Sequence, residues 1–120
     1  MTLTPIHIAA WLFGIAALGG IAMAAMRFSG KPYPPASFAM GHGLLAAAGL
    51  TLLIYAAFTT GVPQLAKVSI ALFLGAAAGG AYMNLQFHRK NLALPKAIVL
   101  GHGLTAAAAY VCLLLAIRGG

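Results

Sequence analysis

Acidic residues are absent from this chain, since none of its 120 residues is Asp or Glu. That absence excludes Ser–His–Asp catalysis and catalysis by paired carboxylates, because both need an acidic side chain. Charged residues make up only 6% of the chain, whereas a soluble domain carries about 25%. A surface so poor in charge does not keep a protein in aqueous solution. The composition therefore excludes an ordinary soluble domain.

Cysteine is nearly absent as well. The single cysteine, Cys112, lies within an apolar run, so it gives no information on disulfides or on the redox compartment. The seven Lys and Arg residues lie almost entirely between long apolar runs, and the isoelectric point of about 10.2 reflects these short connectors. Because no basic stripe lies along a folded surface, we expect no nucleic-acid partner.

Long apolar runs are what the chain contains instead. The four runs cover about residues 5–26, 36–58, 66–87 and 95–117. A run of about 22 residues can cross a hydrocarbon core of about 30 Å as a helix. The first run is too long for the apolar region of a signal peptide and has no basic residue before it, so we expect it to be a true span. The sequence thus predicts one integral membrane domain over residues 1–120, an all-α four-helix transmembrane bundle in contact with lipid.

The connectors between the runs contain glycine and proline, which end helices, and they carry the cations unequally. The side shared by the first and third connectors carries Arg27, Lys31, Arg89, Lys90 and Lys96. Only Lys67 and Arg118 fall on the other side. By the positive-inside rule, the first and third connectors face the cytoplasm and both termini lie outside. We therefore expect a multi-pass protein of the bacterial inner membrane.

An internal repeat of sixty residues relates the two halves of the chain. LFGIAALGGIAM at 12–23 matches LFLGAAAGGAYM at 72–83, and GHGLLAAA at 41–48 matches GHGLTAAA at 101–108. The repeat predicts two copies of one helical hairpin, residues 1–60 and 61–120. Because both copies enter the bilayer from the same side, we expect a pseudo-two-fold axis along the membrane normal, with the matched residues near that axis.

The repeated histidines are the most informative residues. His42 and His102 each lie about seven residues past the proline that opens their helix, about 10 Å below the predicted cytoplasmic interface. Glycine pairs of the other two helices fall at about the same depth, and glycines also flank each histidine. These eight glycines are Gly19, Gly20, Gly79, Gly80, Gly41, Gly43, Gly101 and Gly103. One layer of the bundle is therefore expected to hold two histidines and very few other side chains.

This layer suits one haem b with His42 and His102 as its axial ligands. Two neutral imidazoles would approach the iron from opposite faces, and the glycines would leave clearance for the ring edges. The five cations of the first and third connectors are candidate contacts for the haem propionates. The other nitrogen of each imidazole needs an acceptor. Since the chain has no carboxylate, we expect a backbone carbonyl one turn back to serve.

With four spans and a transverse histidine pair, the sequence resembles small membrane-bound b-type cytochromes of cytochrome b561-like architecture. The resemblance implies electron transfer between a redox partner protein and quinone, as an electron-transfer protein or oxidoreductase subunit rather than a stand-alone enzyme. It is consistent with a homo-oligomer or a larger respiratory-type complex. Many such cytochromes hold two haems with four histidines, but His42 and His102 are the only histidines that repeat between the two halves here. We therefore expect a single-haem variant.

Two other interpretations stay open at this point. The histidines and glycines could serve close helix packing alone, in a cofactor-free structural or anchor subunit of a larger membrane complex. Alternatively, Met23 and Met83 are also a matched pair, and two thioethers with two imidazoles would suit Cu(I) in a small copper-binding or transport protein. The glycine pairs favour haem, because a bare ion needs no such clearance.

Overall fold

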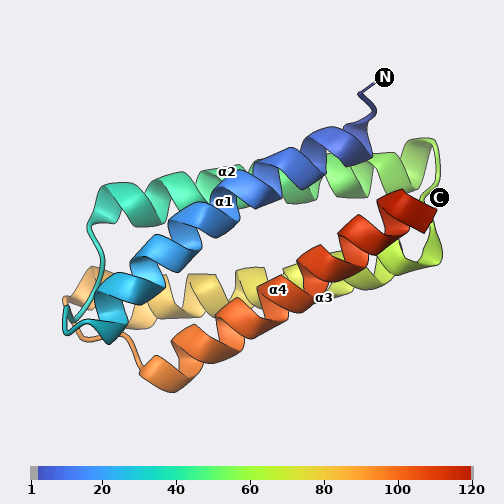
Figure 1. Cartoon of the computed structure of the whole chain (residues 1–120). Coiled ribbons are helices and arrows are strands. Elements are labelled where there is room, and N and C mark those ends of the chain that lie inside the picture. The colour runs from blue at the N-terminus through green and yellow to red at the C-terminus, as the bar shows by residue number, and fades with distance from the viewer. Residues whose placement is uncertain (1–2, 120) are drawn as a thin grey trace.

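The computed structural model describes residues 3–119 and is built from four long helices (Figure 1). They are α1 (Pro5–Phe28), α2 (Ala36–Thr59), α3 (Gln64–Gln86) and α4 (Lys96–Gly119), with a short 3-10 helix η1 (His88–Lys90) after α3. No strand occurs in the described part of the chain. Each of the four long helices is long and apolar enough to cross a membrane. The expectation of an all-α fold with four such helices is therefore confirmed.

Proline determines where several helices begin. Pro5 occupies the first turn of α1, while Pro35 and Pro63 directly precede α2 and α3. Proline suits these positions because the first helical N–H groups have no partner within the helix. The predicted helix bounds hold to within two residues. The helix α1 extends to Phe28, two residues beyond the apolar run, and α3 begins at Gln64, directly after Pro63 and two residues before the apolar run.

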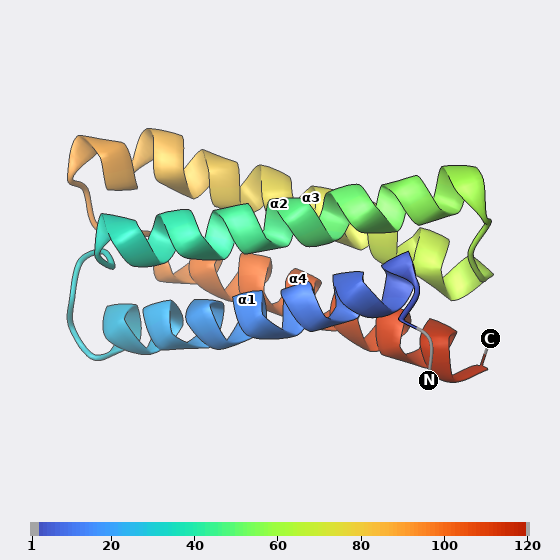
Figure 2. The same cartoon turned by 90° about the horizontal axis from the view of Figure 1, so that it is seen from above.

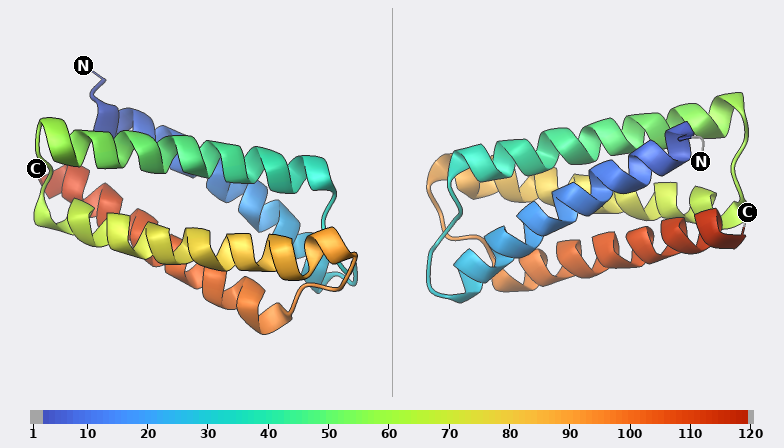
Figure 3. Two further views of the ribbon diagram at one scale, coloured as in Figure 1. Left: turned by 180° about the vertical axis from the view of Figure 1, so that it is seen from behind. Right: turned by 45° about the horizontal axis from the view of Figure 1, so that its top comes forward.

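The helices form two antiparallel hairpins, α1–α2 and α3–α4, which lie side by side (Figures 1 and 2). Both described chain ends and the α2–α3 connector lie at one end, and the α1–α2 and α3–α4 connectors lie at the other (Figure 3). We call the two halves of the bundle the terminal half and the connector half. The bundle measures 42 × 22 × 21 Å.

The buried core lies in the terminal half. It contains Ala9, Ala10, Phe13, Leu53, Ala66, Phe73, Ala109, Leu113 and Ala116. At its centre the rings of Phe13 and Phe73 stack in parallel, with centroids 3.7 Å apart. In contrast, no residue of 36–48 in α2 or 96–108 in α4 is buried. The connector half is thus the less tightly packed part of the molecule.

Large apolar side chains cover the outer surface. Trp11 and Leu18 are each 70% exposed and Phe58 is 87% exposed. So extensive an exposed apolar surface is unfavourable in water and favourable in contact with lipid. The surface and the four long apolar helices are together compatible with a multi-pass membrane protein.

The two connectors at the connector end are bonded to each other. The Arg27 Nε donates to the Leu94 carbonyl at 2.7 Å, and the Leu94 amide donates to the Pro32 carbonyl at 2.9 Å. Leu94 itself is buried. These bonds join the first hairpin to the second at the connector end.

Candidate cofactor site between the hairpins

The structure brings His42 and His102 together. His42 lies six residues into α2 and His102 six residues into α4, about 9 Å along each helix from its start. The two imidazole rings face each other across the bundle, with centroids 6.0 Å apart and planes at 72°. The two predicted ligands therefore form one pair between the hairpins.

Each imidazole is held by the neighbouring helix of its own hairpin. The Nδ1 atoms of His42 and His102 lie 2.7 Å from the carbonyl oxygens of Ala16 and Ala76, respectively. Because a carbonyl oxygen only accepts, each Nδ1 carries the hydrogen and donates it. The expectation of a backbone carbonyl acceptor is confirmed, but its predicted place one turn back is wrong. The acceptors Ala16 and Ala76 lie across the hairpin, on α1 and α3, where the packing of the helices places the imidazoles.

The opposite nitrogen of each ring remains available. With Nδ1 protonated, Nε2 of a neutral imidazole carries a lone pair, which is the form that binds a metal. Neither Nε2 has a hydrogen-bond partner among the described residues, and neither is fully enclosed by them. His42 and His102 thus present two free donor atoms between the hairpins, with their ring orientations fixed by the carbonyls behind them.

The glycine pairs contact the histidine rings. A methyl group added at Gly20 would lie 3.0 Å from Cε1 of His42, and one at Gly80 would lie 3.2 Å from Cε1 of His102. At Gly19 and Gly79 the nearest atoms would be 3.9 and 3.8 Å away. The glycines therefore let the imidazole lie directly on α1 or α3. Their predicted role in clearing a haem stays a prediction.

The glycines that flank the histidines lie on the outer surface. Gly41, Gly43, Gly101 and Gly103 are exposed, and an added methyl group at any of them would meet nothing within 4 Å. The structure thus separates the eight glycines into four that lie beside a histidine side chain and four that do not. Any contact of the outer four with a haem also stays a prediction.

The spacing of the pair fits one metal centre between two imidazoles. Two ring nitrogens that each bind a metal at about 2.1 Å place their ring centroids roughly 6 Å apart, which agrees with the 6.0 Å found here. Interior-facing residues at this level, such as Ala46 and Ala106, are half-buried rather than enclosed. A planar group between the hairpins would cover them further. The donor set, its spacing and its surroundings therefore fit a bis-imidazole haem.

The five predicted propionate contacts all lie at the connector end, but they differ in their burial and in their bonded partners. Arg27 is half-buried and bonded to the Leu94 carbonyl. Lys90 donates to the Gln86 side chain at 2.9 Å, and the Lys96 amine lies 5.7 Å from the centroid of the Phe28 ring. Lys31 and Arg89 are exposed. Arg27 therefore already bonds one connector to the other, and the remaining four cations are exposed.

The alternative metal set also includes two methionines. Met83 is buried and Met23 is half-buried. Copper ligation by two histidines and two methionines stays a prediction.

The stacking of Phe13 and Phe73 below the histidines was not predicted from the sequence. Phe13 lies one turn from Ala16 on α1, so the stacked pair with Phe73 closes the centre of the bundle below the histidines. Nearby, the Tyr110 hydroxyl donates to the Ala10 carbonyl at 2.9 Å and joins α4 to α1. The identity of Phe13 and Phe73 in the repeat was the available signal, but it carries no information on ring stacking.

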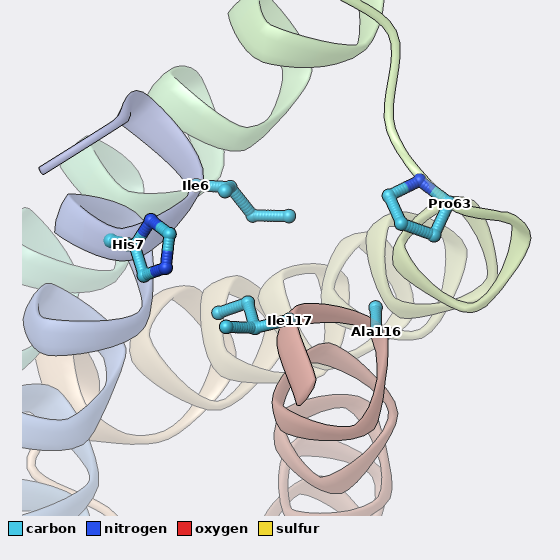
Figure 4. A pocket seen from close by; sticks show the side chains of 5 residues that line it. All are labelled: Ile6, His7, Pro63, Ala116 and Ile117. Atoms are coloured by element: carbon cyan, nitrogen blue, oxygen red, sulfur yellow. The ribbon is translucent and has the colours of Figure 1, made fainter. Parts of the chain in front are cut away.

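A separate hollow lies at the other end of the bundle. It has a volume of about 220 Å³ and is lined by Ile6, His7, Pro63, Ala116 and Ile117 (Figure 4). The Thr4 hydroxyl lies 2.7 Å from Nδ1 of His7. This hollow belongs to the terminal half and does not include either histidine of the central pair.

No protein-family model, curated protein or solved structure matches the chain. The feature that bears most directly on function is therefore the geometry of the His42–His102 pair.

Proposed function

We propose that this chain is a membrane b-type cytochrome, or a cytochrome subunit, that binds one haem b between His42 and His102. It passes electrons between a redox partner and quinone, with the haem near the cytoplasmic side. One observation supports this most strongly: two imidazoles, each held through Nδ1 and with no bonded partner at Nε2 among the described residues, lie between the hairpins with ring centroids 6.0 Å apart.

The membrane setting belongs to the same proposal. The four helices cross the bacterial inner membrane, with both termini outside and the basic connectors in the cytoplasm. Four helices of sufficient length and hydropathy support it. A pseudo-two-fold axis along the membrane normal relates the hairpins. The bonds of His42 to Ala16 and of His102 to Ala76 support that axis, because the second bond repeats the first sixty positions later in the chain.

The residues of the site would hold the haem as follows. His42 and His102 would bind the iron through Nε2, with their rings held by the Ala16 and Ala76 carbonyls behind them. Gly20 and Gly80 allow each ring to lie flat on its neighbouring helix. The Phe13–Phe73 stack excludes the haem and water from the terminal half. A haem bound in this way supplies one-electron redox chemistry.

The test is the visible spectrum and haem content of the protein purified from haem-replete cells. We expect a low-spin b-type α band in the reduced protein and one haem per chain in a pyridine haemochrome assay. His42→Ala and His102→Ala should each abolish both. His7→Ala and His88→Ala are the matched controls, since neither residue belongs to the pair, and they should retain both. A colourless protein, or equal loss in the controls, would refute the proposal.

A second candidate function rests on the glycine contacts. Gly20 and Gly80 already accommodate the imidazoles, and the Ala16 and Ala76 carbonyls already bond them. The same layer could therefore lock each hairpin in a cofactor-free structural subunit of a larger membrane complex. Recovery of a colourless chain only within a complex, with assembly weakened in His42→Ala because the bond to the Ala16 carbonyl is lost, would favour this function over the cytochrome.

A further inference from the structure

The connector end carries a group of exposed cations that the proposed haem site does not explain. These are Lys31, Arg89, Lys90 and Lys96, which we call the basic connector surface. The bonds of Leu94 to Arg27 and to Pro32 hold the first and third connectors together. The four cations therefore lie at one end of the bundle, on or beside connectors that are bonded to each other.

No acidic side chain opposes this charge. The chain contains seven Lys and Arg residues and no Asp or Glu. The partners that the structure shows for these cations are neutral: Lys90 bonds the Gln86 amide oxygen, and Lys96 lies over the Phe28 ring. The surface therefore attracts anions with its full charge, and that attraction falls as salt is added.

Apolar side chains accompany the cations. Phe28 is 44% exposed and Leu92 is 49% exposed, at the level where the apolar helices end. A soluble acidic partner gains little from isolated apolar side chains at the rim of a bilayer. A phospholipid satisfies both features, because its phosphate lies at the headgroup level and its acyl chains begin just below.

We propose that the basic connector surface binds the phosphate headgroups of anionic phospholipids in the membrane that contains the protein. Lys31, Arg89, Lys90 and Lys96 contact the phosphates, while Phe28 and Leu92 contact the first acyl carbons. The proposal rests on the membrane setting of the proposed function but does not need a bound haem. Because lipid retention and haem content are measured separately, failure of this proposal is distinguishable from failure of the cytochrome proposal.

The experiment compares lipid retention by the detergent-purified protein, measured by native mass spectrometry with added phosphatidylglycerol or phosphatidylcholine. We expect preferential retention of phosphatidylglycerol. Each cation near an anionic surface contributes about fivefold in affinity. The variant K31Q/R89Q/K90Q/K96Q should therefore lose the preference by more than about tenfold. The matched control K67Q/R118Q removes cations from the other end of the bundle and should keep it.

Two further measurements keep the outcome decisive. Far-ultraviolet circular dichroism must show equal helix content in both variants. If the fourfold variant does not fold, raising the salt concentration with the unaltered protein must abolish the preference for phosphatidylglycerol. Equal retention of both lipids by the unaltered protein, equal loss in the control variant, or preferential binding of a polyglutamate peptide over phosphatidylglycerol would overturn the proposal.

Discussion

The two halves of this bundle are built from the same four helices but differ in how tightly they are packed. In the terminal half, Leu53 and Leu113 are fully enclosed and the Phe13 and Phe73 rings stack at the centre. In the connector half, the centre is occupied by the His42–His102 pair, and no residue of the first thirteen positions of α2 or α4 is buried. The tightly packed core and the imidazole pair therefore lie at different levels along the bundle axis.

The same separation explains why the connector half needs other means of order. Although Met83 and Leu94 are buried there, hydrogen bonds hold much of this half: the Ala16 and Ala76 carbonyls hold the imidazoles, and Arg27 holds the connectors through Leu94. Where water is excluded, such bonds fix geometry without filling space. The proposed haem would then enter between the hairpins at a level where α2 and α4 have no buried residue.

The largest difference between the halves should appear on truncating leucines. Leu53→Ala removes a fully buried side chain from the terminal half and should lower the free energy of unfolding by about 2 kcal/mol. Leu45→Ala changes a half-buried residue of the same helix in the connector half and should cost less than about 1 kcal/mol. Unfolding of the detergent-solubilised protein, followed by circular dichroism, measures both. Equal costs would contradict the contrast in packing.

Adjacent glycines of α1 offer a sharper test of the histidine layer. Gly20→Ala places a methyl group 3.0 Å from Cε1 of His42 and should displace the ring, so that haem retention falls by roughly tenfold, in line with an overpacking cost of about 1–3 kcal/mol. Gly19→Ala meets its nearest atom at 3.9 Å and should leave haem retention unchanged. Haem content after detergent dilution is the measurement. If the two variants behave alike, Gly20 does not position the ring.

Arg27 tests whether the connectors set the spacing of the hairpins. Arg27→Gln removes the bond to the Leu94 carbonyl and should destabilise the protein by about 1 kcal/mol. Lys31→Gln, at an exposed position four residues later, should change the stability by less than about 0.5 kcal/mol. Thermal unfolding of the two variants gives the comparison. A larger effect of Lys31→Gln would rule out the proposed role of Arg27.

The smallest effect is expected from the polar bond between Tyr110 of α4 and Ala10 of α1 in the terminal half. Tyr110→Phe removes the hydroxyl that donates to the Ala10 carbonyl and should cost about 0.6 kcal/mol, as is common for bonds between transmembrane helices. Gly14→Ala should have a similar effect, because its methyl group would lie 2.8 Å from that hydroxyl. Combining the two changes should cost little more than either alone, and a double-mutant cycle measures this. Full additivity would show that the two residues are not coupled.

Much of the fold could be predicted because its signals are local. The apolar runs and the prolines predicted the four helices to within two residues, and the repeat pointed to His42 and His102 as partners. The repeated Phe13 and Phe73 were expected near the centre of the bundle, and the structure buries both. Length, hydropathy and helix-breaking residues carry this information within a single segment.

The details of the site could not be predicted, because they depend on how helices pack against each other. No pattern within α2 identifies the Ala16 carbonyl as the partner of His42, since the bond crosses the hairpin. Likewise, the sequence shows Gly19 and Gly20 as equivalent, but only Gly20 lies against Cε1 of the ring. The bond of Arg27 to Leu94 spans 67 residues and has no counterpart in the second hairpin, where Phe87 replaces the arginine.

Hydrogen–deuterium exchange of the apoprotein, before and after addition of one equivalent of haem, tests the contrast between the halves most directly. If the connector half holds the cofactor, protection of the amides around His42 and His102 should increase on haem addition. Amides around Leu53 and Leu113, which the core already encloses, should not change. No change around the histidines, or an equal increase in both halves, would contradict the account.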